Sequence, residues 1–137
     1  MRKISEVMTT NVKVVRPQDT VENAAKMMAD LDVGAIPVCD GKRLQGMITD
    51  RDITIRATAE GRGGDTPVRE VMTADIVWCT EEDDTQEVLN RMADAQIRRI
   101  PVVDQDRNLV GIVALGDLAG EDEQNVDEAL RDISLPA

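Results

Sequence analysis

The chain has 137 residues and a formal net charge of −11, with 27 acidic and 16 basic side chains and no histidine. This length fits one compact domain or two small halves that share a core, and the acidic balance argues against a duplex nucleic-acid partner, which is bound through a basic face. Because the sequence has one Trp and no Phe or Tyr, it also offers no row of aromatic side chains on which single-stranded bases could stack.

The first predicted elements are a short helix, a strand and a longer helix. Residues 4–8 are expected to form the short helix and residues 12–15 the strand. Asp19 and Glu22 match a capping box, which predicts a helix over residues 20–31. The apolar residues of this helix follow the i, i+3, i+4, i+7 spacing that is typical of one buried face. They are Val21, Ala24, Ala25, Met28 and Leu31.

A hairpin and another helix follow. Residues 36–39 and 44–48 are predicted strands, and the Asp-Gly pair between them is typical of a tight hairpin turn. A helix is then expected over residues 49–59, where apolar side chains recur on one side.

Beyond a Gly-rich stretch the pattern starts again. The glycines of residues 61–67 predict a flexible hinge, and Thr66 and Pro67 are expected as the N-cap and first residue of the next helix. Residues 120–137 are an acidic tail with apolar residues at helical spacing, which predicts either a short amphipathic helix or a disordered, solvated segment. Between the hinge and the tail, the predicted elements are a strand over residues 76–79, a helix over residues 84–95, and strands over residues 100–103 and 108–113.

The second half of the chain repeats the first. Residues 4–9 (ISEVMT) return as residues 68–73 (VREVMT), and residues 33–38 (VGAIPV) return as residues 97–102 (IRRIPV). Between these matches the register holds without a gap, and a single residue is inserted in the turn that follows. The chain is therefore an internal duplication.

A Thr-x-x-Asp turn follows the second strand of the first hairpin. Thr49 as N-cap would leave backbone N–H groups facing an anion at the positive end of the helix, and Asp52 could accept hydrogen bonds from the two vicinal hydroxyls of a ribose. The alternative is a capping box that only closes the turn. In the second copy Asp117 matches Asp52 but Ala114 replaces Thr49, so the first turn is expected to bind a ligand more tightly.

Each copy resembles a CBS domain, because it contains in order the Met-Thr segment, the apolar-Pro-Val strand, the strand with a Gly and the turn with its Asp. The pair is similar to tandem CBS modules that bind adenosine-containing ligands. The resemblance covers about residues 1–119 and implies a mixed α/β (α+β) fold, in which two β-α-β-β-α repeats pack with pseudo-two-fold symmetry. The implied divisions are repeats at residues 1–60 and 68–119, the hinge at 61–67 and the acidic C-terminal tail at 120–137.

The resemblance also implies two ligand clefts, each between the Asp turn of one repeat and the first strand and pre-Pro segment of the other. Asp52 would hold a ribose, Thr49 would lie near a phosphate, and the first strand of the second repeat would contact the base. Residues expected in the first cleft are Thr49, Arg51, Asp52, Asp75, Ile76, Val77, Ile97, Arg98 and Arg99. Those expected in the second are Asn11, Val12, Lys13, Val33, Gly34, Ala35, Ile112 and Asp117.

Two adjacent arginines distinguish the second copy. Arg98 and Arg99 stand where the first copy has Gly34 and Ala35, so the fold does not require charge at these positions. Pairing with Asp or Glu side chains of this acidic chain is one explanation. Recognition of phosphate is the other, because the Arg fork suits bidentate binding. Arg51 is either a third positive group at the site or a solvated side chain.

Catalysis is not expected. With two cysteines and no histidine, one chain is not expected to assemble a zinc site or a Cys-His nucleophile, and no activated nucleophile, metal cluster or catalytic cofactor is predicted. Cys39 and Cys79 fall at non-equivalent positions of the two copies and are expected to be buried, reduced thiols.

The sequence and the resemblance together predict a regulatory module that senses AMP, ADP or ATP, forms a homodimer and acts either on a separate, unidentified effector protein or on its own oligomer. NAD and S-adenosylmethionine are alternative ligands, since adenosine is the shared part. A ligand-free structural or stress-associated dimer is the alternative function. No signal peptide, membrane span or nucleic-acid partner is expected, and the cytoplasm is the expected location.

Overall fold

The computed structural model describes residues 2–118. Their packing forms two compact units. One is Lys13–Ile76, here the first-repeat unit, and the other combines residues 2–12 with residues 77–118, here the second-repeat unit. The predicted hinge at residues 61–67 thus lies inside the first-repeat unit.

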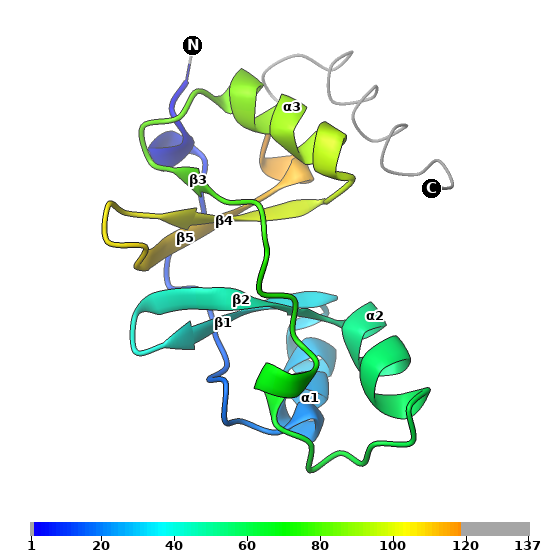
Figure 1. The fold of residues 1–137 in the computed structure, drawn as a ribbon. Coiled ribbons are helices and arrows are strands. Elements are labelled where there is room, and N and C mark those ends of the chain that lie inside the picture. The colour runs from blue at the N-terminus through cyan, green and yellow to red at the C-terminus, as the bar shows by residue number, and fades with distance from the viewer. Residues whose placement is uncertain (1, 119–137) are drawn as a thin grey trace. The chain divides into compact units, whose positions relative to one another are not determined.

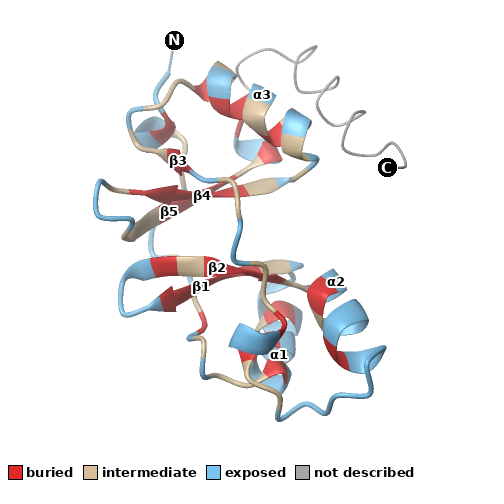
Figure 2. Cartoon of the chain, viewed as in Figure 1, coloured by how far each residue is buried: buried red, intermediate tan, exposed pale blue. Residues whose placement is uncertain are grey.

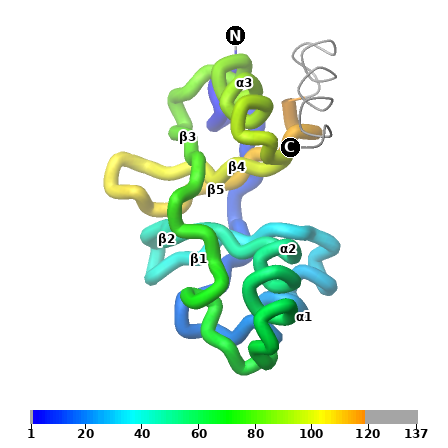
Figure 3. Tube along the Cα trace, turned by 45° about the vertical axis from the view of Figure 1, so that its right-hand side comes forward, coloured from blue at the N-terminus to red at the C-terminus, as the bar shows by residue number. Residues whose placement is uncertain are grey.

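The first-repeat unit is a two-stranded hairpin with helices on one face (Figure 1 and Figure 3). Residue Val15 adds a single parallel bridge to Val38, so the strand predicted over residues 12–15 is reduced to that bridge. The elements are α1 (Val21–Leu31), antiparallel β1 (Ala35–Asp40) and β2 (Arg43–Thr49), α2 (Asp50–Asp52), which continues as a π-helix (Ile53–Thr58), and a 3₁₀ helix (Val68–Glu70).

Helix α1 begins one residue later than the capping box predicts. Thr20 is the N-cap, and its hydroxyl accepts a hydrogen bond from the backbone N–H of Asn23 at 3.1 Å. The Asp19 carboxylate instead accepts the backbone N–H of Arg16 at 2.8 Å, which takes it away from the helix. The predicted Asp19 cap is therefore wrong, because two potential capping residues are adjacent and the preceding turn uses the first.

The buried face of α1 is narrower than predicted. Val21, Ala24 and Met28 are buried against the hairpin, whereas Ala25 is exposed and Leu31 is 43% exposed. Figure 2 shows both buried and exposed residues along α1. The expected burial of Ala25 and Leu31 is wrong, since the face of α1 that packs in the core is narrower than the stripe typical of a surface helix.

The segment that leads into each repeat, residues 4–9 in the first and 68–73 in the second, is here called its leading segment. Each leading segment pairs with the hairpin of the other repeat. Thr73, from the leading segment of the second repeat, pairs with Met47 of β2 through two backbone hydrogen bonds of 2.9 Å. Thr9, from the first repeat, pairs in the same way with Ile112 of β5, at 2.9 and 3.0 Å. A Cβ at Gly46 would collide with the carbonyl oxygen of Thr73, so this close approach requires glycine.

The second-repeat unit has a three-stranded sheet of order β3-β4-β5, in which β3 runs parallel and β5 antiparallel to β4. Asp84, predicted as the first residue of the helix, is instead the N-cap of α3, and its side chain accepts the backbone N–H of Gln86. The strand predicted over residues 76–79 is mostly wrong, since only Cys79 and Thr80 form ladder pairs. The elements are a 3₁₀ helix (Ile4–Glu6), β3 (Cys79–Thr80), α3 (Thr85–Ala95), β4 (Arg99–Val103), β5 (Leu109–Ala114) and a 3₁₀ helix (Leu115–Leu118).

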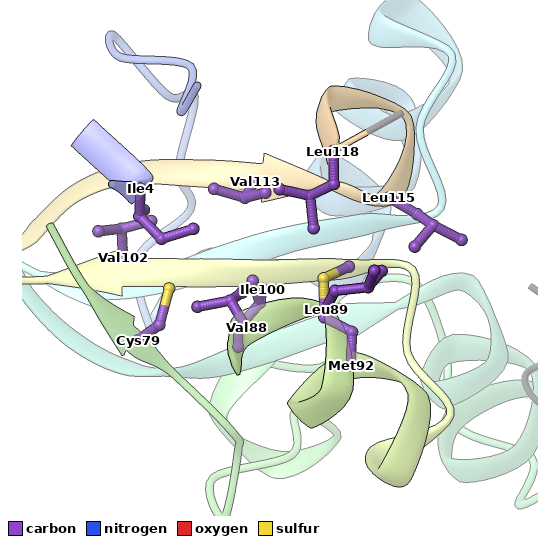
Figure 4. Packing of buried hydrophobic residues seen from close by; sticks show 10 residues of the cluster. All are labelled: Ile4, Cys79, Val88, Leu89, Met92, Ile100, Val102, Val113, Leu115 and Leu118. Atoms are coloured by element: carbon purple, nitrogen blue, oxygen red, sulfur yellow. The ribbon is translucent and has the colours of Figure 1, made fainter. Parts of the chain in front are cut away.

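The core of this unit lies between α3, the sheet and the 3₁₀ helices (Figure 4). Ile4 from the leading segment belongs to it and is fully buried. The cluster consists of Ile4, Cys79, Val88, Leu89, Met92, Ile100, Val102, Val113, Leu115 and Leu118. Residues 2–12 are thus an integral part of the fold of the second repeat.

Both cysteines are buried and neither forms a disulfide, as predicted. Burial raises the pKa of Cys39 to about 11, and burial together with the nearby Asp83 carboxylate raises that of Cys79 to about 12. Thiols held protonated in this way are poor nucleophiles.

Two predicted short helices are corrected. The short helix expected over residues 4–8 is a single 3₁₀ turn, Ile4–Glu6, and Pro67 rather than Thr66 is the N-cap of Val68–Glu70. The predicted tail at residues 120–137 lies outside the described residues. No helix in the described part of the chain is long and apolar enough to cross a bilayer.

Candidate functional site

The turn between β2 and α2 holds its Thr and Asp in reciprocal hydrogen bonds. The Thr49 hydroxyl accepts the backbone N–H of Asp52 at 3.0 Å, and Oδ2 of Asp52 accepts the backbone N–H of Thr49 at 3.0 Å. The capping box is therefore formed. Within this box Asp52 is largely buried, with 9% of the residue exposed.

A second hydroxyl and an arginine approach the same carboxylate. The Thr73 hydroxyl donates to Oδ1 of Asp52 at 3.2 Å and lies 3.5 Å from Oδ2. Nε of Arg56 is 3.9 Å from Oδ1, and Nη1 of Arg56 donates to the carbonyl of Met72 at 3.0 Å. Asp52, Arg56 and residues 72–73 thus form one polar network at the end of the hairpin.

The helix that carries Arg56 is a π-helix. The backbone N–H of Ala59 bonds the carbonyl of Thr54 at 2.9 Å, which is the i→i+5 pattern. Wide turns of this kind are frequent at functional sites.

The equivalent turn of the second repeat is simpler. Oδ2 of Asp117 accepts the backbone N–H of Ala114 at 2.8 Å, and Ala114 has no hydroxyl to return a bond. Asp117 is exposed, unlike Asp52. Thr9 corresponds to Thr73, and among the described residues its hydroxyl has no hydrogen-bond partner.

Each pre-Pro segment lies beside the Asp turn of its own repeat. The backbone N–H of Asp50 donates to the Gly34 carbonyl at 2.9 Å, and that of Leu115 donates to the Arg98 carbonyl at 2.8 Å. In register, Arg99 pairs with Ala114. The expected clefts assign these segments to the opposite repeat, so the adjacency within each unit is a feature that the sequence reasoning missed.

The residues expected in each cleft are divided between the two units, so both clefts stay predictions. For the first, the first-repeat unit contains Thr49, Arg51, Asp52, Asp75 and Ile76, and the second-repeat unit contains Val77, Ile97, Arg98 and Arg99. For the second, the first-repeat unit contains Lys13, Val33, Gly34 and Ala35, and the second-repeat unit contains Asn11, Val12, Ile112 and Asp117.

The twin arginines have no counter-ion in the described part of the chain. Arg98 is exposed and Arg99 half-buried, and neither guanidinium forms an ion pair or hydrogen bond with a residue of the described range. Arg51 is also exposed. Pairing with an acidic side chain therefore does not explain the two arginines within residues 2–118.

Sequence reasoning missed Thr73 and Arg56. The signal for Thr73 is the Met-Thr pair that ends both leading segments, and the signal for Arg56 is its position one helical turn after Asp52. The contact between Arg56 and Asp52 follows from their i,i+4 spacing, whereas only the pairing of Thr73 with β2 brings Thr73 to the same carboxylate.

A family model described as the CBS domain matches residues 4–57 and 68–132, which are the two copies of the duplication. The chain belongs to the CBS domain family. Its mixed helix and sheet content with two CBS repeats confirms the predicted fold class.

Relatives of similar length share this organisation. Over 136 residues, 98% of this chain, it is 48% identical to the CBS domain-containing protein YhcV of Bacillus subtilis (strain 168), of which 96% is covered. It is 38% identical over 121 residues to Hypoxic response protein 1 of Mycobacterium tuberculosis (strain ATCC 25618 / H37Rv), covering 87% of this chain and 84% of that one.

Solved structures of CBS proteins have the same fold. The crystal structure of Hypoxic Response Protein I with two coordinated zinc ions aligns with a TM-score of 0.80 and 37% identity, over 88% of this chain and 99% of that one. The CBS domain pair of MJ0100, in complex with 5′-methylthioadenosine and S-adenosyl-L-methionine, aligns with a TM-score of 0.77 and 25% identity. The alignment covers 88% of this chain and 94% of that one. In residues 2–118 of this chain, no group of His, Cys, Asp or Glu side chains is arranged to hold a metal ion.

Proposed function

We propose that this CBS protein is a regulatory module that binds an adenine nucleotide, AMP, ADP or ATP, in clefts to which both repeats contribute. It performs no catalysis, because its candidate site supplies carboxylates, hydroxyls and arginines without an activated nucleophile. Cys39 and Cys79 do not add one, since both thiols are buried and protonated.

The observation that carries the proposal is the fixed carboxylate of Asp52. Its Oδ2 accepts one backbone N–H and its Oδ1 one hydroxyl, while a carboxylate has about four lone-pair sites. Each oxygen therefore keeps one site for a further donor. Two vicinal hydroxyls supply a matching pair of donors, which is the group that a ribose presents.

The phosphate is assigned to the arginines. Arg98 and Arg99 have no partner among the described residues, and a guanidinium binds phosphate through two parallel hydrogen bonds. The Thr49 hydroxyl, near the first turn of α2, lies at the phosphate end of the proposed first cleft. The base would lie against Asp75, Ile76 and Val77, whose main-chain groups can read an adenine edge.

Both ligands bound by MJ0100 contain adenosine, which supports adenosine as the recognised part. NAD and S-adenosylmethionine are alternative ligands for this chain. Ligand binding would act by favouring one of two packing states of the module, typically by about 1–3 kcal/mol. We propose that the module works in the cytoplasm as a homodimer that passes this change to an effector protein.

Calorimetric titration of the full chain with AMP, ADP, ATP, NAD and S-adenosylmethionine tests the proposal. We expect one of the adenine nucleotides to bind most tightly and to raise the melting temperature, since a free concentration of about 100 times Kd stabilises a protein by about 2.7 kcal/mol. Arg98→Ala should weaken a nucleotide with phosphate far more than adenosine, whereas Arg43→Ala, which removes an exposed arginine at the start of β2, should not.

The second candidate function is a ligand-free structural dimer. It is favoured by one observation, that the Asp52 carboxylate already has partners within its own unit. Absence of binding by every member of the panel would favour this candidate over the nucleotide sensor.

A further inference from the structure

We propose that Thr73 is a positioning residue, which orients the Asp52 carboxylate for the ribose hydroxyls and so sets the preference of the first site for a ribonucleotide. This inference rests on the proposed function. It concerns a residue of the leading segment of the second repeat, outside the turn that carries the Thr-x-x-Asp motif.

Two bonds are needed to fix a carboxylate. The backbone N–H of Thr49 holds Oδ2 at 3.0 Å, but this single bond restrains rotation about the Cβ–Cγ axis less tightly than bonds to both oxygens would. The hydroxyl of Thr73 holds the other oxygen, Oδ1, at 3.2 Å. With both oxygens held, their remaining lone pairs point in fixed directions. The carboxylate is then already ordered before a ligand binds, so its ordering does not reduce the affinity.

The Thr73 hydroxyl is itself well anchored. The backbone of Thr73 makes two hydrogen bonds of 2.9 Å with Met47, and the preceding carbonyl, of Met72, accepts Nη1 of Arg56 at 3.0 Å. Gly46 allows this approach because a Cβ there would meet the Thr73 carbonyl. The donor therefore comes from a rigid, paired backbone rather than from a free loop.

The second repeat provides the internal comparison. Thr9 has the same backbone pairing, with Ile112, yet among the described residues its hydroxyl has no partner, and Asp117 is held by one backbone N–H. The two Asp turns thus differ in whether a threonine from the leading segment orients the carboxylate. Thr9→Val is for this reason the matched control for Thr73→Val.

The experiment measures how strongly each variant prefers a ribose. In an Asp117→Ala background, which restricts binding to the first site, AMP and 2′,3′-dideoxy-AMP are titrated against Thr73→Val, Thr73→Ser, Thr9→Val and Asp52→Asn. We expect Thr73→Val to weaken AMP about two- to tenfold, the cost of one hydrogen bond, with a smaller effect on the dideoxy compound. Thr73→Ser should restore the preference, and Thr9→Val should leave it unchanged.

The outcomes separate this inference from the function on which it rests. Two results would overturn the positioning role and leave nucleotide binding intact. One is equal weakening of AMP and dideoxy-AMP binding by Thr73→Val. The other is a loss of AMP binding free energy in the Asp52→Asn, Thr73→Val double variant that equals the sum of the losses in the two single variants. No binding of AMP by the unaltered chain overturns both. A melting temperature for each variant near that of the parent, with a changed preference, supports the inference.

Discussion

The hydroxyl of Thr73 lies 3.2 Å from Oδ1 of Asp52, across 21 positions of sequence. Thr73 belongs to the segment that leads into the second repeat, whereas Asp52 ends the strand-to-helix turn of the first. This bond therefore joins the candidate ribose acceptor to the start of the chain segment that runs on to Asp75 and Ile76, two residues proposed to contact the base.

The two Asp turns are expected to differ in stability. Asp52→Ala removes the carboxylate half of the capping box and the acceptor of the Thr73 hydroxyl, so it should lower the free energy of unfolding by about 1–2 kcal/mol. Asp117→Ala removes one exposed acceptor and should cost less. Urea unfolding of both variants measures the difference, and a larger loss for Asp117→Ala would contradict the proposed role of the polar network.

The same pair of variants tests the ranking of the sites. Because the first turn holds its carboxylate at both oxygens and also carries the Thr49 hydroxyl, Asp52→Ala should weaken nucleotide binding more than Asp117→Ala. Calorimetric titration with AMP checks this, with Asp106→Ala, in the exposed β4–β5 turn, as a control for the loss of one negative charge. A stronger loss from Asp117→Ala would reverse the ranking.

Thr85→Val is expected to stabilise the protein by about 1 kcal/mol. The Thr85 hydroxyl is fully buried in the second-repeat unit and has no hydrogen-bond partner, and an unsatisfied buried polar group is costly. The first repeat has Val21 at the corresponding position. Thermal and urea unfolding measure the gain. Thr20→Val, which removes the hydroxyl that caps α1, should instead destabilise by about 1 kcal/mol.

Alanine at either strand glycine should disrupt the exchange of leading segments. A Cβ at Gly46 would meet the Thr73 carbonyl, and a Cβ at Gly111 would lie 2.7 Å from the Met8 sulfur, so each substitution forces backbone or side chain to shift at a cost of about 1–3 kcal/mol. Gly116→Ala, where a Cβ meets nothing within 4 Å, is the control. Equal melting temperatures for all three variants would refute this account.

The buried thiols make stability fall at alkaline pH. In the folded chain the pKa is raised from 9.0 to about 11 at Cys39 and about 12 at Cys79, so the unfolded chain loses these protons first as the pH rises. Their contribution is complete below about pH 9 and is lost toward pH 11 and 12. Urea unfolding between pH 8 and pH 10.5, compared with Cys39→Ala and Cys79→Ala, should show a shallower decline in the variants.

The sequence was sufficient for the duplication, the hairpins and α3, because each depends on local signals. The Asp-Gly turn and the alternation of apolar residues act on neighbours only a few residues away. It was insufficient for the first strands of both repeats. Only Val15 in one, and Cys79 with Thr80 in the other, find ladder partners, and whether a backbone finds a partner depends on distant residues.

The candidate site shows the same division. Thr49 and Asp52 form the capping box that their spacing predicts. The bond from Thr73 could not be read from local pattern, since it requires a distant segment to pair with β2. Arg98 and Arg99 could be singled out from sequence as unlike their counterparts, but their lack of partners in the described range depends on how the chain folds.

The exchange of the leading segments determines which fragments of the protein can fold on their own. A fragment of residues 1–60 would keep the first hairpin but lack the Met47 partner at Thr73, and it would carry Ile4 without the core that buries it. Lys13–Ile76, in contrast, contains every partner of its own hairpin. Truncations designed on the repeat boundaries should therefore give unstable, aggregation-prone polypeptides. A fragment that begins at Lys13 and ends at Ile76 should instead fold as a domain.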